Sequence, residues 1–282
     1  MILKSFAKIN WILYIVGEKD GHHMLDGVME TIGLYDIIEI NSTDGEICTA
    51  YKDLPLMEGD LCLKAARLFF EEMGIKGGAD IKVEKHIPMG AGLGGGSSNG
   101  ACVLFGLNEL YNNPLNTEEL IAAASKIGAD AAFFIEGGAQ RARGKGEVLS
   151  PVKRTKPLRL LIAKPKNKGV STPAAYKLYD SMPKGEKGDV EGMITALEQG
   201  DESIVARCMF NSLEAPALKL LPEIEQVKES MIKSGAFQTM MTGSGSAVVG
   251  LIGNVTINEE YLQDLWYWIG ETAEKGIEIL SE

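Results

Sequence analysis

Residues 88–98 read PMGAGLGGGSS, and a stretch with helical spacing follows them directly. Five of these eleven residues are glycines, which let backbone N–H groups turn toward one point and let an anion approach closely. The first turn of the following helix would add unpaired N–H groups and a partial positive charge. The segment therefore predicts a phosphate-binding loop, called the glycine loop below, made of Pro88, Met89, Gly90, Ala91, Gly92, Leu93, Gly94, Gly95, Gly96, Ser97 and Ser98.

Three other interpretations of the glycine loop fit less well. A P-loop ends in Gly-Lys-Ser/Thr, and no lysine occurs between Lys85 and Lys126. A G-x-G-x-x-G string is present, but a dinucleotide fold also needs a second strand with an acidic residue about 20 positions on. Here the expected helix leads to a proline-containing loop and another helix. A flexible linker is disfavoured because Leu93 and a helix start lie between two regularly patterned elements.

The first half of the chain mixes strand and helix patterns. A polar turn is expected between Gly17 and Gly27, and Asn116 with Glu119 has the spacing of a helix-capping box. Alternating apolar residues predict strands, and spacing of three to four predicts helices. The expected strands are residues 2–6, 9–16, 36–40 and 79–85, and the expected helices are residues 61–73, 97–111 and 117–127.

The second half follows a basic stretch at residues 153–157, which is a plausible linker. A strand at residues 158–163, three or four helices, a strand pair flanking residues 242–246 and a closing helix are expected after it. Strands and helices are mixed without strict alternation, so the sequence predicts an α+β protein. The length of 282 residues favours two domains, expected at residues 1–152 and 153–282.

Composition narrows the class of protein. Hydrophobic residues make up 45% and charged residues 24% of the chain, an ordinary balance for a globular protein. A net charge of −11 disfavours a nucleic-acid partner, which requires a basic surface. The apolar runs are shorter than the roughly 20 residues of a membrane helix, and no secretory signal is expected. Because the four cysteines are scattered, reduced thiols and a cytoplasmic location are expected.

Read with six further segments, the glycine loop resembles the GHMP small-molecule kinases, a family that includes galactokinase, homoserine kinase, mevalonate kinase and phosphomevalonate kinase. The likeness spans nearly the whole chain and is strongest to members that phosphorylate a cytidine diphosphate-linked polyol of non-mevalonate isoprenoid synthesis. The further segments are Ala7-Lys8-Ile9-Asn10, Asp20-Gly21-His22-His23, Gly128-Ala129-Asp130 with Phe133-Phe134, Val170-Ser171-Thr172, Asn211-Ser212-Leu213-Glu214 and Thr242-Gly243-Ser244-Gly245-Ser246.

The resemblance implies a two-domain architecture and a reaction. The N-terminal domain would resemble domain 2 of ribosomal protein S5, the C-terminal domain would be ferredoxin-like, and the site would lie between them. The γ-phosphate of ATP would be transferred to a hydroxyl of the small-molecule substrate. Mg²⁺ is expected because the ATP phosphates need charge compensation, and Ser97 or Ser98 is a candidate for its ligand.

The resemblance also implies two catalytic residues. Asp130 would accept the proton of the substrate hydroxyl, and Lys8 would keep Asp130 ionised and offset charge in the transition state. The residues alone leave other roles open. Asp130 suits the N-cap of a helix or a surface acid equally well, and a lysine beside an edge strand is usually solvated.

The substrate side rests on Asn10, His22, His23 and Tyr176. His22 stands where the family usually has tyrosine, so stacking there would depend on an imidazole. Tyr176 is expected to stack on the cytosine, although it also fits the apolar face of an ordinary helix. Residues 242–246 are expected to form a second phosphate-side loop rather than a simple tight turn.

Two other functions stay open from the sequence. One is a kinase of the same family acting on a mevalonate- or sugar-like alcohol, and the other is a nucleotide-binding regulator that has lost catalysis. The presence of both Lys8 and Asp130 disfavours the regulator, because a pure binder has no need of a base. The protein is expected to act as a monomer or weak homodimer.

Overall fold

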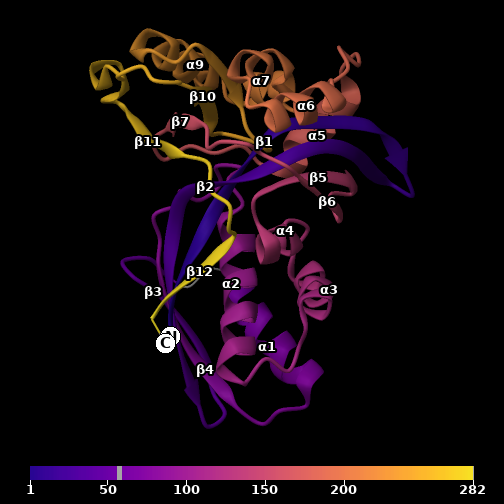
Figure 1. Cartoon of the computed structure of the whole chain (residues 1–282), viewed down its shortest axis with the longest axis vertical. Coiled ribbons are helices and arrows are strands. Elements are labelled where there is room, and N and C mark those ends of the chain that lie inside the picture. The colour runs from indigo at the N-terminus through magenta and orange to yellow at the C-terminus, as the bar shows by residue number, and fades with distance from the viewer. Residues whose placement is uncertain (56–58, 282) are drawn as a thin grey trace.

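The computed structural model of the chain describes residues 1–55 and 59–281. Its strands form two sheets, and Figure 1 shows them in different parts of an elongated molecule. The larger sheet contains β1 (Ile2–Lys19), β2 (His22–Thr43), β3 (Ile47–Tyr51), β4 (Gly78–Glu84), β5 (Ala139–Gly144), β6 (Val148–Val152), β8 (Phe210–Asn211) and β12 (Ile277–Ser281). The smaller sheet, in the order β11-β7-β10-β9, contains β7 (Arg159–Pro165), β9 (Gln238–Met241), β10 (Val248–Leu251) and β11 (Leu265–Glu271).

The helices divide between the two sheets in the same way (Figure 1). Beside the larger sheet lie α1 (Leu61–Met73), α2 (Gly95–Leu110), α3 (Thr117–Ile127) and α4 (Ala131–Glu136). Over the smaller sheet lie α5 (Thr172–Ser181), α6 (Val190–Gln199), α7 (Glu202–Cys208), α8 (Glu214–Leu220) and α9 (Glu223–Ser234), with a 3-10 turn at Glu259–Leu262. The expected α+β class is confirmed, and the second half holds more helices than the three or four expected.

A long hairpin of β1 and β2 runs through both parts of the molecule (Figure 1). The two strands pair antiparallel over nearly their whole length, with bulges that include one between Phe6 and Ala7. That bulge separates the two short strands expected from the sequence, which are parts of one strand. The polar turn expected between Gly17 and Gly27 is confined to Asp20 and Gly21, both with positive φ, because pairing continues up to Lys19 and from His22.

Of the helices of the first half, α1 and α2 pack against the larger sheet, and α3 packs against α1, α2 and α4. In α1 the buried side chains recur at helical spacing, from Cys62 through Ala65 to Phe69. The N-terminus of α3 carries the expected capping box: Asn116 accepts a hydrogen bond from the Glu119 backbone and Glu119 accepts one in return. These contacts give α2 a fixed support, so that its N-terminus has a defined position at the end of the glycine loop.

The smaller sheet is covered on both faces. In β7 the side chains of Leu160 and Ile162 join one apolar cluster, and those of Leu161 and Ala163 join another. The first cluster contains residues of α6 and α7, and the second contains residues of α5, α8 and α9. Burial on both faces explains the continuous apolar run of this strand.

The expected closing helix is wrong. Residues 265–271 form β11, which pairs with β7, and residues 277–281 form β12, which pairs with the start of β1. The run Leu265-Trp-Tyr-Trp-Ile consists of aromatic and β-branched or apolar residues that favour a strand once an edge is available. The division of the chain at residue 152 stays a prediction, and the last strand lies in the larger sheet with the N-terminal strand.

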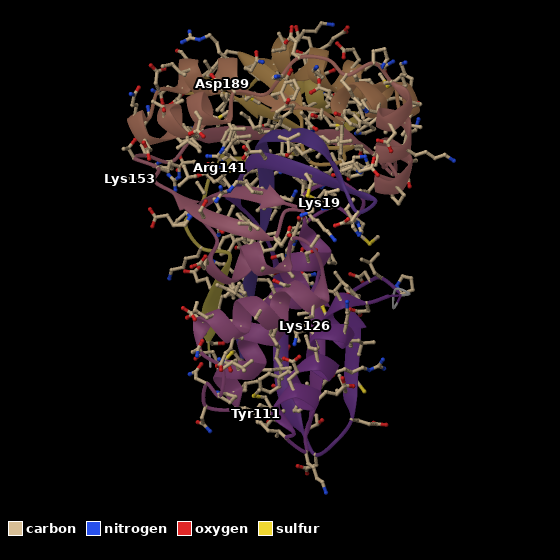
Figure 2. The ribbon with its side chains drawn as sticks, turned by 90° about the vertical axis from the view of Figure 1, so that its right-hand side faces the viewer. Lys19, Tyr111, Lys126, Arg141, Lys153 and Asp189 are labelled. Atoms are coloured by element: carbon tan, nitrogen blue, oxygen red, sulfur yellow. The ribbon has the colours of Figure 1, made fainter. Side chains whose placement is uncertain are left out.

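The two parts of the molecule are joined by an ion pair network as well as by the hairpin. Arg141 of β5 donates to both carboxylate oxygens of Asp26 at 2.8 Å and to Glu191 of α6 at 2.7 Å. Figure 2 shows Arg141 where the two parts meet. Within residues 1–55 and 59–281, no helix has both the length and the hydrophobicity needed to cross a membrane.

Candidate active site

A cavity of about 580 Å³ lies between the glycine loop, the β1–β2 hairpin, the start of α4 and the segment leading into α5. Ten of the eleven residues of the glycine loop line it, from Pro88 to Ser97. Lys8, Asn10, Asp130 and Tyr176 line it as well. Four candidate residues from distant parts of the chain therefore meet at one cavity.

The glycine loop turns through backbone conformations that favour glycine. Gly90, Gly92 and Gly94 have φ angles of 61°, 79° and 71°, in the left-handed region. The loop is tied on two sides, because Leu93 accepts a hydrogen bond from the Lys8 backbone and Ala91 accepts one from Ala247, both at 3.0 Å. A loop held in this way presents the N-terminus of α2 to the cavity, which is the arrangement that binds phosphate groups.

A second loop, residues 242–246, packs directly against the glycine loop. A Cβ atom on Gly92 would lie 2.6 Å from the carbonyl oxygen of Thr242, so the two backbones are in close contact. Asn211 holds the second loop by donating to the carbonyls of Met241 at 2.7 Å and Gly243 at 2.8 Å. Because Gly243, Ser244 and Gly245 line the cavity, this loop faces the same space as the first.

Lys8 and Asp130 approach each other at the cavity wall. The Nζ atom of Lys8 lies 3.5 Å from Oδ2 of Asp130 and donates to Oδ1 of Asn10 at 2.7 Å. The Lys8 side chain is 6% exposed and that of Asp130 is 34% exposed. Asp130 occupies the N-cap position of α4, yet its side chain makes no capping hydrogen bond. Its carboxylate is therefore directed to Lys8 and the cavity, which argues against a purely capping role.

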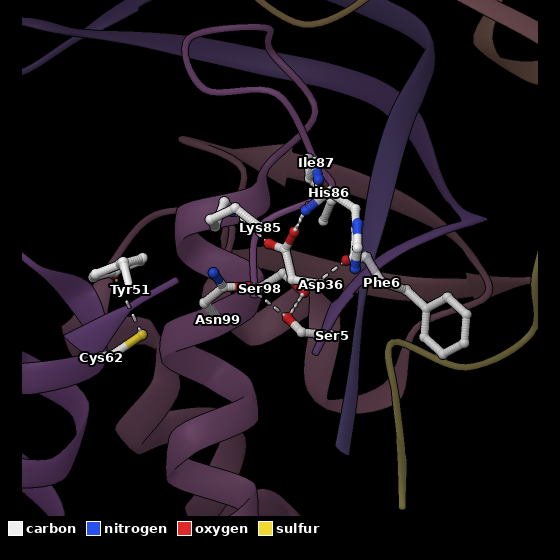
Figure 3. Close-up of polar contacts among 10 residues, drawn as sticks. All are labelled: Ser5, Phe6, Asp36, Tyr51, Cys62, Lys85, His86, Ile87, Ser98 and Asn99. Carbon is white, nitrogen blue, oxygen red and sulfur yellow. Dashed lines mark hydrogen bonds and ion pairs between the residues drawn. The ribbon is translucent and has the colours of Figure 1, made fainter. Parts of the chain in front are cut away.

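A buried ion pair between Asp36 and Lys85, which the sequence did not predict, holds the start of the glycine loop. Asp36 is fully buried and accepts hydrogen bonds from the backbones of His86 at 2.7 Å and Ile87 at 2.8 Å, and it pairs with the ammonium group of Lys85 (Figure 3). These three residues lead straight into Pro88, so Asp36 fixes the point where the loop begins. The available sequence signal was a charged residue in phase with the inward-facing Ile38 and Ile40.

The two serines at the end of the glycine loop have different positions. Ser98 is fully buried. Its hydroxyl donates to the carbonyl of Phe6 at 2.6 Å and lies 2.7 Å from the hydroxyl of Ser5 (Figure 3). Of the two serines suggested as metal ligands, only Ser97 lines the cavity. Among the residues that the structure describes, no three His, Cys, Asp or Glu side chains gather to hold a metal ion.

The aromatic partner of Tyr176 is His23 rather than His22. The rings of His23 and Tyr176 are 4.7 Å apart between centroids and tilted by 34°, and Nε2 of His23 lies 2.7 Å from Oδ1 of Asp180. Burial, with a smaller effect of the Asp130 charge, raises the pKa of Tyr176 to about 12. His22 is exposed. Neither histidine lines the main cavity, and His23 lines a neighbouring one of about 570 Å³.

Comparisons with known proteins agree with this geometry. The model of the GHMP kinases N terminal domain matches residues 60–138, and that of the GHMP kinases C terminal domain matches residues 193–262. The 4-diphosphocytidyl-2-C-methyl-D-erythritol kinase of Desulfitobacterium hafniense (strain Y51) is 38% identical over 280 residues, 96% of each chain. The kinase of the same name from Clostridium novyi (strain NT) is 40% identical over 258 residues, 90% of this chain and 92% of that protein.

Solved structures give the same result. The crystal structure of a 4-(cytidine 5'-diphospho)-2C-methyl-D-erythritol kinase superposes with a TM-score of 0.80 at 32% identity, covering 96% of this chain and 99% of that one. The homoserine kinase of Cytophaga hutchinsonii ATCC 33406 shares the fold, with a TM-score of 0.73 at 20% identity and coverage of 99% and 97%. On the sequence matches, the fold and the glycine loop, this chain belongs to the GHMP kinases.

Proposed function

We propose that this chain transfers the γ-phosphoryl group of ATP to a hydroxyl of 4-diphosphocytidyl-2-C-methyl-D-erythritol, in non-mevalonate isoprenoid precursor synthesis. The relatives quoted above carry the name of this kinase at 38% and 40% identity over most of the chain. The observation that carries the proposal is the approach of Lys8 to Asp130 within 3.5 Å at a cavity walled by the glycine loop.

Asp130 is proposed as the general base. Its carboxylate faces the cavity and is partly exposed, so a substrate hydroxyl has access to it. A base within hydrogen-bond reach of the attacking hydroxyl takes up the proton as the oxygen bonds to phosphorus. The bond between the γ-phosphorus and the bridging oxygen breaks in the same transfer, and ADP is the leaving group.

Lys8 is proposed to stabilise two negative charges, that of the Asp130 carboxylate and that developing on the transferred phosphoryl group. Its buried ammonium group is held by Asn10 at 2.7 Å, so it needs no rearrangement when negative charge develops on the phosphoryl oxygens. Preorganised charges of this kind, in a site that excludes water, are a large part of enzymatic rate enhancement. Asn10 thereby orients the cation, and we also propose that it contacts the substrate.

The backbone N–H groups of the glycine loop are proposed to bind the ATP phosphates. The tight packing of Gly92 against Thr242 leaves no room for side chains at this point and allows the backbone to approach an anion closely. Mg²⁺, when bound, would offset the negative charge of the phosphates, and Ser97 is the loop hydroxyl placed to contact it or its water.

The cytidine end of the substrate is proposed to meet the aromatic pair of Tyr176 and His23. Their rings already lie in contact, tilted by 34°, so a cytosine would pack beside or between them. His22 is exposed, and we propose that it reaches the base only if the hairpin end moves. The net charge of −11 supports an enzyme without a nucleic-acid partner, and we further propose a cytoplasmic location on the scattered cysteines.

The test is a coupled assay of ADP release with Mg-ATP and four acceptors: 4-diphosphocytidyl-2-C-methyl-D-erythritol, mevalonate, homoserine and galactose. Turnover with the cytidyl substrate alone is the expected result. Turnover with another acceptor alone would overturn the substrate and leave the roles of Lys8 and Asp130 standing. Nucleotide binding without turnover on any of the four would favour the non-catalytic regulator.

A further inference from the structure

A second groove, of about 500 Å³, lies on the other side of the first residues of the glycine loop. One wall is Pro88, Met89 and Gly90, and the other is the segment 164–169 together with Trp266. Three of the six residues in that segment are lysines. The net charge of the chain is −11, so this groove is locally basic in an acidic protein.

Lys164 is the unusual member of this group, because it is buried. It continues the inward-facing positions of β7 after Leu160 and Ile162, where the alternation calls for an apolar residue. Its backbone pairs with that of Trp266 on β11, so the two side chains stand on the same face of the sheet. Only 4% of Lys164 is exposed to solvent, and the residue lines the groove.

The ammonium group of Lys164 has few partners within the protein. It donates to the carbonyl of Pro165 at 3.1 Å, and it takes part in none of the ion pairs found among residues 1–55 and 59–281. An ammonium group has three N–H donors, and burying it without a counter-charge is costly. Consistent with this, burial lowers the pKa of Lys164. The cost would be recovered by an anion in the groove.

The other two lysines keep the groove positive. Lys166 is exposed and donates to the carbonyl of Gln263 at 2.9 Å, which leaves its charge without a carboxylate in the described ion pairs. Lys168 pairs with Glu223 of α9. One cation of the three is therefore neutralised, and Lys164 and Lys166 together retain two positive charges at the groove.

We propose that this groove binds the phosphate or diphosphate group of a small organic molecule, with Lys164 as the buried anchor and Lys166 at the rim. The indole of Trp266 provides an apolar surface for the rest of the molecule. A Cβ atom on Gly169 would lie 2.8 Å from the carbonyl oxygen of Gly90, so the groove touches the start of the glycine loop.

The first test is calorimetric titration of inorganic diphosphate into the full chain, with and without a saturating non-hydrolysable ATP analogue that covers the glycine loop. The wild-type protein is expected to bind one diphosphate saturably in the presence of the analogue. Lys164→Met is expected to weaken this binding at least about tenfold, as the loss of a charged hydrogen bond does. Lys82→Met, which removes the same charge from an exposed position, is the matched control and should bind as wild type.

Stability separates a binding role from a structural one. Methionine restores the apolar alternation of β7, so Lys164→Met should unfold at the same temperature as the wild type or higher. Should this variant fail to fold, the same titration is made with Lys166→Gln, which changes an exposed residue. Its affinity for diphosphate is expected to fall about threefold to tenfold. Wild-type affinity for diphosphate in either folded variant, or no saturable binding to the wild type, would overturn the proposal.

The same titrations are independent of the proposed kinase function. If the ATP analogue does not bind, this result argues against the proposed kinase function. A diphosphate affinity that depends on Lys164 would still support anion binding in the groove. A comparison of inorganic phosphate with phenyl phosphate tests the Trp266 surface. Tighter binding of phenyl phosphate, lost in Trp266→Ala, is expected, and equal affinities would show that the Trp266 surface adds nothing to binding, contrary to the proposal.

Discussion

Lys8 of β1 and Asp130 at the start of α4 meet with Nζ 3.5 Å from Oδ2, at the wall of the main cavity. The pair is asymmetric, because the lysine is buried at 6% exposure and the carboxylate is open to the cavity at 34%. A buried cation that is already held by Asn10 can orient the carboxylate without covering it. This division of roles leads to the first two predictions.

Asp130→Asn is expected to reduce turnover by about 10²–10⁴-fold, because the amide cannot take up the hydroxyl proton. Affinity for ATP should stay nearly unchanged, since the backbone of the glycine loop carries nucleotide binding. ADP release and equilibrium nucleotide binding measure the two effects. Glu136→Gln, an exposed carboxylate at the other end of α4, should keep wild-type turnover. Full turnover in Asp130→Asn would remove this residue from the mechanism.

Lys8→Met is expected to reduce turnover by about 10²–10³-fold through loss of a preorganised charge. Because Lys8 acts partly through Asp130, the double variant Lys8→Met/Asp130→Asn should lose little more than the more damaging single variant. Steady-state rates of the four proteins give this cycle. Lys4→Met, which removes a charge from the same strand where it pairs with Glu278, is the control. Strictly multiplicative losses would mean that the two residues act separately.

Gly92→Ala is expected to weaken ATP binding, because φ is 79° and the new Cβ would lie 2.6 Å from the Thr242 carbonyl. The two loops would have to separate, which displaces the N–H groups that face the phosphates. Gly74→Ala is the matched control, with φ of 60° and nothing within 4 Å. It should cost about 1 kcal/mol of stability and leave nucleotide affinity as in the wild type. Equal ATP affinities in both variants would contradict the tight packing.

Tyr176→Ala is expected to raise the KM of the cytidyl substrate about tenfold, as loss of aromatic stacking on a base does. Tyr176→Phe should behave like the wild type. The pKa of the hydroxyl is raised to about 12, so it stays neutral over the working pH range, and the proposed contact with the base is made by the ring. Initial rates at varied substrate and fixed ATP measure both. A large KM effect in the Phe variant would assign the contact to the hydroxyl instead.

Glu30 is expected to make stability depend on pH. It is fully buried, accepts from Trp11 Nε1 at 2.6 Å and pairs with Arg154, and burial raises its pKa from 4.5 to about 7. The folded state therefore holds this proton more tightly than the unfolded chain does. The resulting stabilisation is complete below pH 4.5 and is lost as the pH rises through about 7.

Urea unfolding from pH 5 to pH 8 measures this effect. Relative to Glu30→Gln, which stays neutral, the wild type should lose on the order of 3 kcal/mol across the window from 4.5 to 7. Glu39→Gln is the control, since hydrogen bonds from Asn41 and Lys82 lower the pKa of this exposed group and its charge does not change between pH 5 and 8. A constant difference between wild type and Glu30→Gln would show that Glu30 keeps one protonation state.

Local features were predictable because neighbours in the sequence determine them. The glycine loop follows from residues that adopt positive φ without steric cost, and the capping box at Asn116 follows from a side chain that bonds its own helix. Family resemblance implies Lys8 and Asp130 as site residues, and the structure brings them together. Their roles stay predictions, and nothing in their positions along the sequence indicates that the two side chains lie close together.

Tertiary structure decided what depends on long-range pairing and burial. Residues 265–271 suit a helix or a strand until β7 offers an edge, and that edge makes them a strand. His23 rather than His22 contacts Tyr176, because both histidines lie in β2, where successive side chains point to opposite faces. Asp36 became a support of the glycine loop only when folding buried it beside Lys85. Backbone preference acts within a few residues, whereas burial and strand pairing are properties of the assembled chain.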